Sequence, residues 1–211
     1  MFEYLSTYTD IIERYSIDEC FLDYTASVKL LGDPIKTAYK IKDDIYKKFG
    51  FTVNVGVGNN KLLAKMASDF EKPNKVHTLF SNEVKDKLFH LPVNELFMIG
   101  KASAKKLKEL NINTIGELAN YPLEDLVLRF KSMGKLMHDY ANGIDDSPVH
   151  YEKESIKSVS SSVVLPYNYK EDAMIKDVMM QLSMEVGKKI RNNKMYADTI
   201  GVWIKYNYFD K

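Results

Sequence analysis

The adjacent carboxylates of Asp18 and Glu19 are the residues whose types and spacing point most directly to chemistry. They lie in Tyr-Ser-Ile-Asp-Glu-Cys-Phe-Leu-Asp, residues 15–23, between two short apolar runs. The aromatic and branched flanks favour strands, which predicts a hairpin around residues 15–25 with both acids at or near its tip. Asp-Glu is a poor sequence for a two-residue hairpin turn, and a turn that breaks the local preference is a candidate functional position. Carboxylate oxygens are also the ligands that Mg²⁺ prefers. The alternative is a pair of solvated turn acids.

Cys20 and the four histidines are the other side chains with reactive or metal-binding groups. Cys20 stands among apolar neighbours, which favours a small packing residue over a nucleophile. The histidines show no ligand spacing with Cys20 or with one another, so no zinc site is predicted. They are His77, His90, His138 and His150. A single cysteine excludes an intrachain disulfide framework and fits a reducing cytosol, which predicts a cytoplasmic protein.

A glycine-rich turn forms the second candidate site. Residues 56–65 read Gly-Val-Gly-Asn-Asn-Lys-Leu-Leu-Ala-Lys, where a predicted strand passes into a predicted helix. Free backbone N–H groups at such a turn suit an anion, although the spacing is not that of a P-loop. A tight structural turn is the alternative. Lys72 follows in Lys-Pro-Asn, where proline fixes the exit of the chain and would hold the lysine in place; a solvated surface lysine is the alternative.

A basic turn forms the third candidate site. Residues 96–107 predict two helices joined by a tight turn at Gly100, with Lys101, Lys105 and Lys106 beside the N–H groups of the second helix. This arrangement would clamp a phosphodiester backbone without reading its sequence. The alternative is an ordinary helical hairpin with an exposed basic face. The spacing of Thr114 and Glu117 predicts a capping box on the next helix.

Composition describes an ordinary globular chain. Its 211 residues carry a net charge of +1, with 45% hydrophobic and 28% charged residues, so nucleic-acid binding would have to come from local basic patches. No apolar run is long enough to span a bilayer, and the N-terminus lacks the pattern of a signal peptide. The composition therefore favours one large or several small domains without a membrane segment.

The apolar patterns predict an α+β fold around these sites. Helices are expected over residues 2–13, 34–49, 62–70 and 170–192, and strands over 51–57, 76–80, 160–165 and 199–209. Residues 81–146 are read as short helices with breaks at Pro92, Gly100, Pro122 and Gly134. The predicted domains are a layered sheet-and-helix unit over 1–80, a small all-helical domain over 81–146, a linker over 147–157 and an α/β unit over 158–211.

Together, and in this order, the three candidate stretches resemble the Y-family, or translesion, DNA polymerases, above all the UmuC/DinB-like bacterial branch. Residues 15–23 resemble the palm hairpin of that family, and residues 56–74 resemble its second palm signature. Residues 98–107 look like the helix-hairpin-helix of its thumb. Residues 158–211 are similar to the start of its little finger. The resemblance implies a partial palm over 1–80, a helical thumb over 81–146 and a partial α/β little finger.

The resemblance also implies a DNA-directed DNA polymerase that acts in DNA damage tolerance. It implies that Asp18 is a metal ligand and that Glu19 assists at the 3′-hydroxyl side of a two-metal site. It also implies that Lys72 contacts the triphosphate of the incoming nucleotide. The implied cofactor is Mg²⁺, with Mn²⁺ as a substitute. The implied DNA-binding residues of the thumb are Gly100, Lys101, Ser103 and Lys106.

The implied partners are primer-template DNA and a deoxynucleoside triphosphate, with a sliding clamp that would bind through residues beyond Lys211. The family carries a further metal-binding aspartate and a fingers domain that would precede Met1, and Met98 stands where the family often has glycine. We therefore expect a core piece of such a polymerase with weak or no activity of its own. A non-catalytic DNA-binding remnant is one alternative. Another two-metal palm enzyme, such as a nucleotide cyclase, is disfavoured by the basic helical hairpin.

Overall fold

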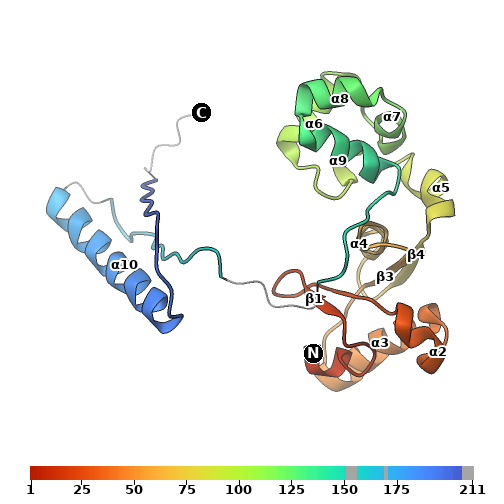
Figure 1. The fold of residues 1–211 in the computed structure, drawn as a ribbon, viewed down its shortest axis with the longest axis horizontal. Helices are drawn as coiled ribbons and strands as arrows, with labels where there is room; N and C mark the ends of the chain where they lie inside the picture. The colour runs from red at the N-terminus through yellow and green to blue at the C-terminus, as the bar shows by residue number, and fades with distance from the viewer. Residues whose placement is uncertain (151–155, 169–170, 206–211) are drawn as a thin grey trace. The chain divides into compact units, whose positions relative to one another are not determined.

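The chain divides into two compact units, residues 1–152 and 153–211 (Figure 1). A computed structural model describes residues 1–150, 156–168 and 171–205. In these three ranges no helix is both long and apolar enough to cross a membrane. The domain boundaries predicted within the chain, at residues 80, 146 and 157, stay predictions.

The first unit begins with alternating strands and helices and ends in a run of helices. Its strands are β1 (Ile12–Arg14), β2 (Cys20–Leu22), β3 (Val55–Gly58) and β4 (Val76–Leu79). Its longer helices are α3 (Pro34–Phe49), α4 (Lys61–Asp69), α6 (Lys101–Lys108), α8 (Leu123–Phe130) and α9 (Ser132–Ala141). The short helices are α1 (Phe2–Leu5), α2 (Val28–Leu31), α5 (Val84–Leu88) and α7 (Ile115–Ala119), with 3₁₀ turns η1 (Thr25–Ser27), η2 (Ser81–Glu83) and η3 (Val93–Glu95).

The strands of this unit pair in two separate two-stranded sheets. β1 and β2 form an antiparallel hairpin, in which Ile12 pairs with Leu22 and Arg14 with Cys20. β3 and β4 are parallel, and α4 connects them as the crossover helix of a βαβ unit. The mixed α and β character is therefore confirmed. The single layered sheet that the sequence predicts is not formed by the described residues, because strands of three or four residues offer few groups for further pairing.

Local capping signals place the two helices that follow the hairpin. The Asp33 side chain accepts from the Lys36 N–H at 2.8 Å, Pro34 takes the first helical position, and Gly50 ends α3 in the left-handed conformation. Asn60 caps α4 by accepting from the Leu63 N–H at 2.8 Å. Helix α3, helix α4 and strand β4 therefore confirm the predicted elements within a residue of each bound.

Three predicted elements of the first unit are wrong in extent. The hairpin expected around residues 15–25 spans residues 12–22, because residues 15–19 form its loop. The helix expected over residues 2–13 ends at Leu5, and Ile12 instead starts β1, since pairing of this segment with β2 overrides the helical spacing of the apolar residues. The strand expected over residues 51–57 begins only at Val55, the first residue with a ladder partner on β4.

The helical end of the unit confirms most of the predicted breaks. Thr114 and Glu117 form the predicted capping box, with hydrogen bonds of 3.1 and 3.0 Å. The predicted break at Gly134 is wrong, because Gly134 lies inside α9 and the chain breaks instead at Lys131, with φ 56°. A Cβ on Gly134 would lie 2.2 Å from the Leu126 carbonyl oxygen, so glycine is needed there for the close approach of α8 and α9.

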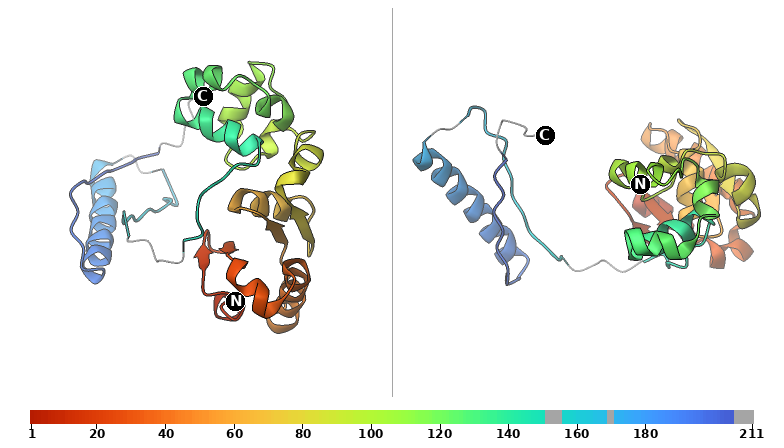
Figure 2. Two further views of the ribbon diagram at one scale, coloured as in Figure 1. Left: turned by 45° about the vertical axis from the view of Figure 1, so that its right-hand side comes forward. Right: turned by 90° about the horizontal axis from the view of Figure 1, so that it is seen from above.

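Two apolar clusters hold the first unit together. The larger one joins α4 and β4 to the helices up to α9, and its fully buried members include Leu63, Leu79 and Leu118. The smaller one packs Leu5 and Tyr8 against Ile41 and Ile45 of α3. Figures 1 and 2 show α6–α9 grouped at one end of this unit and α3 at the other, with β3, α4 and β4 between them.

The second unit contains one helix among its described residues, α10 (Asp172–Asn192), as predicted. No residue of α10 is buried, and its apolar residues Ala173 and Met179 are exposed. The predicted strand over 160–165 is not formed, and neither is the described part, 199–205, of the strand expected over 199–209; residues 206–209 lie outside the described ranges. The predicted α/β little finger is therefore not confirmed, since a lone helix has no sheet on which to bury its apolar face.

Candidate active site

The acid pair lies in a five-residue loop that joins β1 to β2. The loop, residues 15–19, closes with hydrogen bonds from the Tyr15 and Ser16 N–H groups to the Glu19 carbonyl oxygen, at 3.0 and 3.2 Å. The Ser16 hydroxyl accepts from the Glu19 N–H at 3.2 Å and donates to Asp18 Oδ1 at 2.8 Å. Both acids lie near the tip, as predicted. The loop does not depend on Asp-Glu as a two-residue turn, because Ser16 supplies the side-chain bonds that organise it.

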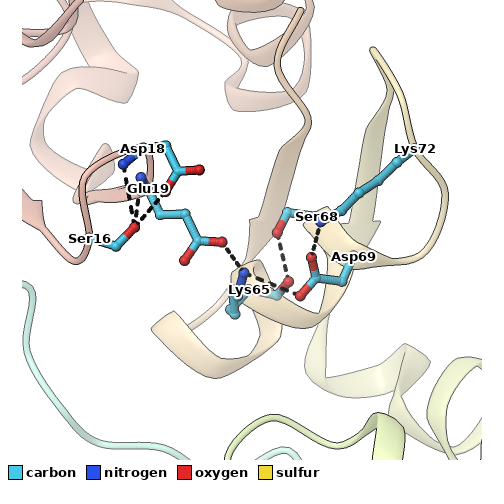
Figure 3. A network of polar contacts seen from close by, with 7 residues as sticks. All are labelled: Ser16, Asp18, Glu19, Lys65, Ser68, Asp69 and Lys72. Atoms are coloured by element: carbon cyan, nitrogen blue, oxygen red, sulfur yellow. Dashed lines mark hydrogen bonds and ion pairs between the residues drawn. The ribbon is translucent and has the colours of Figure 1, made fainter. Parts of the chain in front are cut away.

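Glu19 belongs to a chain of alternating charges that continues along α4 (Figure 3). Its Oε1 lies 2.5 Å from Lys65 Nζ, and Lys65 Nζ lies 3.2 Å from Asp69 Oδ2, one helical turn further on. Asp69 Oδ1 in turn lies 2.7 Å from Lys72 Nζ. The structure therefore links Lys72 to Glu19 through Asp69 and Lys65. Asp18 bonds to Ser16 and lies outside this chain of charges.

Burial and pairing act in opposite directions on the charged groups of this network. Burial alone would lower the pKa of Lys65, but its hydrogen bonds to Glu19 and Asp69 outweigh burial and raise that pKa. Burial would raise the pKa of Asp69, but hydrogen bonds from Lys72 and Lys65 outweigh burial and lower it. Lys65 and Asp69 are therefore both ionised at neutral pH.

Asp18 and Glu19 are the residues that could hold a divalent cation here. Glu19 already pairs with one cation, the Lys65 ammonium. Within the described ranges no group of three or more His, Cys, Asp or Glu side chains is placed to hold a metal ion. Two carboxylates fit Mg²⁺ bound together with substrate phosphates, which is the usual mode for this ion.

The glycine-rich turn before α4 has a structural explanation. A Cβ on Gly56 would lie 1.9 Å from the Ala64 carbonyl oxygen, and one on Gly58 would lie 2.7 Å from the Ala64 N atom, so both glycines let α4 pack closely on β3. The Leu62 N–H at the start of α4 donates to Asp145 Oδ2 at 3.1 Å. The anion expected at this turn is therefore an internal carboxylate, which the sequence analysis missed because Asp145 lies 83 residues away along the chain.

A half-buried ion pair lies beside the hairpin. Lys61 Nζ is 2.7 Å from Glu13 Oε2 and 5.2 Å from the centroid of the Phe21 ring. The same Glu13 oxygen accepts from the His150 N–H at 2.8 Å. Burial would raise the pKa of Glu13, but the hydrogen bonds from Lys61 and from the His150 N–H outweigh burial and lower it. No sequence spacing signals this cluster, because its members come from β1, α4 and the segment after α9.

Cys20 packs as expected for a structural residue. It is half-buried against the smaller apolar cluster. Burial raises the pKa of its thiol to about 11, against a small opposing effect of the Arg14 charge. The thiol is protonated at neutral pH and is therefore a poor nucleophile.

The basic turn places a row of lysines at and beyond the start of α6. Gly100 is the N-cap in an extended conformation and makes no side-chain cap, so the first N–H groups of α6 are open to an acceptor such as phosphate. Lys101 and Lys106 are exposed, and Ser103 is half-buried. Lys106 also lines a shallow groove with Lys105, Arg129, Ala102 and Glu109.

The predicted helix-hairpin-helix is not confirmed at this turn. The segment before Gly100 contains the 3₁₀ turn η3, Val93–Glu95, where a full helix was expected. Met98 has a left-handed φ of 71°, which interrupts helical geometry between η3 and α6.

The chain is similar in sequence to known protein families and proteins. Residues 1–69 match the impB/mucB/samB family, and residues 156–211 match the C-terminal domain of that family. DNA polymerase IV of Clostridium acetobutylicum is 42% identical over 209 residues, which cover 99% of this chain and 52% of that protein. The chain thus spans about half the length of the curated relatives it matches.

Solved structures show the same relationship. A Y-family DNA polymerase chimera superposes with a TM-score of 0.77 at 33% identity, over 89% of this chain and 55% of the chimera. An insertion ternary complex of Dbh DNA polymerase superposes with a TM-score of 0.65 at 32% identity, over 89% of this chain and 55% of that polymerase. The family matches, the sequence identities and the shared fold agree, and this chain belongs to the Y family of DNA polymerases.

Proposed function

We propose that this chain carries part of the catalytic and DNA-binding apparatus of a DNA-directed DNA polymerase that copies damaged templates. Family membership supports the reaction class. The observation that carries the assignment to residues is the network that joins Glu19, beside Asp18, to Lys72 through α4. A carboxylate pair and a lysine held on two elements that contact each other suit a nucleotide triphosphate bound with a divalent cation.

In this proposal Asp18 and Glu19 hold Mg²⁺, for which Mn²⁺ substitutes, in a two-metal arrangement. The metal, when bound, would neutralise the triphosphate and stabilise charge at the reacting phosphate. Asp18 and Glu19 supply hard oxygen ligands from a loop that Ser16 organises. Lys72, whose side chain is 57% exposed, can turn from Asp69 to a triphosphate oxygen as a mobile point charge.

We further propose that the start of α6 grips the primer-template duplex. Gly100 and Ser103 would lie at the open N–H groups of the helix, and Lys101 and Lys106 would neutralise phosphates. The template base would select the nucleotide by pairing, with the protein holding the backbone. A sliding clamp as a further partner stays an expectation.

The candidate metal site contains only two carboxylates in the described ranges, which limits the catalytic activity expected of these 211 residues. Within the described ranges no third acid is placed with these two to hold a metal ion, so nucleotide transfer by the chain alone should be weak or undetectable, several orders of magnitude below a complete two-metal site. The same observation favours a second candidate function, in which the chain binds DNA through α6 without catalysis.

Single-nucleotide primer extension tests the proposal. The chain and its Glu19→Gln variant are compared with Mg²⁺ and with Mn²⁺, and primer-template binding is measured by fluorescence anisotropy in the same samples. Weak extension that the variant loses would support the catalytic role. No extension with the duplex still bound would favour the DNA-binding function. Failure to bind the duplex at low salt would contradict both.

A further inference from the structure

The proposed function gives no task to Lys65, which lies at the centre of the charged network. Its ammonium lies between two carboxylates, 2.5 Å from Glu19 and 3.2 Å from Asp69, and its side chain is 14% exposed. The Glu19 side chain is 40% exposed, so solvent screens this contact in part. Glu19 is also a proposed metal ligand. The same carboxylate would therefore have two cationic partners that compete for it.

We propose that Lys65 is a positioning residue whose ammonium group occupies the cation-binding position beside the Glu19 carboxylate until a metal ion binds there. This inference rests on the proposed role of Glu19 as a metal ligand. In the structure Lys65, on α4, holds the Glu19 side chain through this ion pair (Figure 3). Metal binding to Glu19 then requires this ion pair to break or lengthen, so that Lys65 lowers the metal affinity of the free protein.

Asp69 makes this exchange feasible. A half-buried lysine that lost its only carboxylate partner would be left with an uncompensated charge, which is strongly unfavourable. Lys65 has a second carboxylate four residues further along the same helix, and Asp69 Oδ2 is already at 3.2 Å. When Glu19 turns to a metal ion, Lys65 can stay paired with Asp69.

The contact between Asp69 and Lys72 extends the exchange to the nucleotide. Asp69 divides its two oxygens between Lys65 and Lys72, at 3.2 and 2.7 Å. A triphosphate that draws Lys72 away would leave Asp69 free to pair more fully with Lys65. Nucleotide binding would in this way help to release Glu19 toward the metal.

Metal titration in the absence of DNA and nucleotide isolates the first step. Mn²⁺ affinity of the 211-residue chain is measured from the electron paramagnetic resonance signal of free Mn²⁺, for the wild type, Lys65→Met, Glu19→Gln and the double variant. Lys65→Met should bind Mn²⁺ about three- to tenfold more tightly, as expected for the loss of a partly buried competing ion pair. In the Glu19→Gln background the same substitution should change the affinity less than about twofold, because the contact that it removes is absent.

Two further variants control for charge and folding. Lys75→Met removes the same charge from a lysine that pairs with Glu71, outside this network, and should change Mn²⁺ affinity less than about twofold. Lys65→Arg keeps the positive charge and should bind Mn²⁺ less tightly than Lys65→Met does. Circular dichroism and the thermal midpoint of each variant establish that it is folded.

The outcomes separate this inference from the function on which it rests. An equal gain from Lys65→Met in both backgrounds would show a long-range charge effect and overturn the positioning role. Unchanged or weaker Mn²⁺ binding by folded Lys65→Met would overturn it as well. If Glu19→Gln alone leaves Mn²⁺ binding unchanged, Glu19 is no metal ligand, and the proposed metal site itself is contradicted.

Discussion

At the residue scale, Glu13 shows how one half-buried carboxylate can join three separate segments. Its oxygens contact the Lys61 ammonium at 2.7 and 2.9 Å and accept the His150 N–H at 2.8 Å. The side chains of Glu13 and Lys61 are only 16% and 14% exposed, so this pair escapes most of the solvent screening that weakens surface ion pairs. Glu13 thereby fastens the segment after α9 to the strand that leads into the acid loop.

The lowered pKa of Glu13 makes its contribution to stability depend on pH. Because the folded state binds this proton more weakly than the unfolded state, the contribution is full above the unfolded pKa, about 4.3, and is lost as pH falls through the folded pKa. Glu13→Gln should lower the free energy of unfolding by about 1 kcal/mol at pH 7 and by much less at about pH 3. Urea unfolding at the two pH values measures both differences.

The exposed Glu3 of α1 provides the matched control for Glu13. Glu3→Gln makes the same change of charge on the surface and should leave the free energy of unfolding within about 0.5 kcal/mol at pH 7. A Glu13→Gln effect that did not shrink on acidification would mean that packing, and not the ion pair, carries the contribution.

At the scale of elements, α4 positions most of the candidate site. Its N-terminus is capped twice, locally by Asn60 and from a distance by Asp145. One of its faces is buried in the larger cluster through Leu62, Leu63 and Met66, and the other carries the lysines that pair with Glu13 and Glu19. The helix therefore links the packing of the first unit to the charges beside the acid loop.

Removal of the distant cap should measurably weaken this arrangement. Asp145→Ala is expected to lower the free energy of unfolding by about 0.5–2 kcal/mol, because it leaves the Leu62 N–H without an acceptor and removes a negative charge from the start of the helix. The exposed neighbour Asp146 is the control, and Asp146→Ala should change stability by less than about 0.5 kcal/mol. Equal effects of the two substitutions in chemical unfolding would show that the cap contributes nothing.

At the scale of the whole molecule, charge is balanced and yet locally concentrated. The net charge is +1, so any attraction to nucleic acid must come from a local surface such as α6, where Lys101, Lys105, Lys106 and Lys108 lie within eight residues. Such a surface contributes affinity that depends strongly on salt and little on base sequence.

Salt-dependent DNA binding tests this surface. Replacement of both Lys101 and Lys106 by alanine should weaken duplex binding and reduce the slope of log affinity against log salt by roughly one to two units. Replacement of Lys36 and Lys47, two exposed lysines of α3, makes the same change of charge elsewhere and should leave the slope nearly unchanged. An unaltered slope in the α6 variant would mean that this turn is only structural.

The amino-acid sequence by itself determined the features that depend on local chemistry. Asp33, Pro34 and Gly50 bound α3, and Thr114 with Glu117 forms a capping box, because a cap involves residues three or four positions apart. The order of the three motifs was also enough to identify the polymerase family, which the comparisons confirm. The same motifs yielded the candidate residues Asp18, Glu19 and Lys72.

Only the tertiary structure decided which of these residues meet and what surrounds them. Asp145 fills the anion place at α4, Glu13 pairs with Lys61, and Lys65 pairs with Glu19 over separations of 83, 48 and 46 residues. No spacing rule reaches that far, because such contacts depend on how α4 packs between the hairpin and the helices. For the same reason the apolar pattern alone predicted a helix where β1 forms. Residues 12–14 are a strand because they pair with β2, and their local propensity does not decide this.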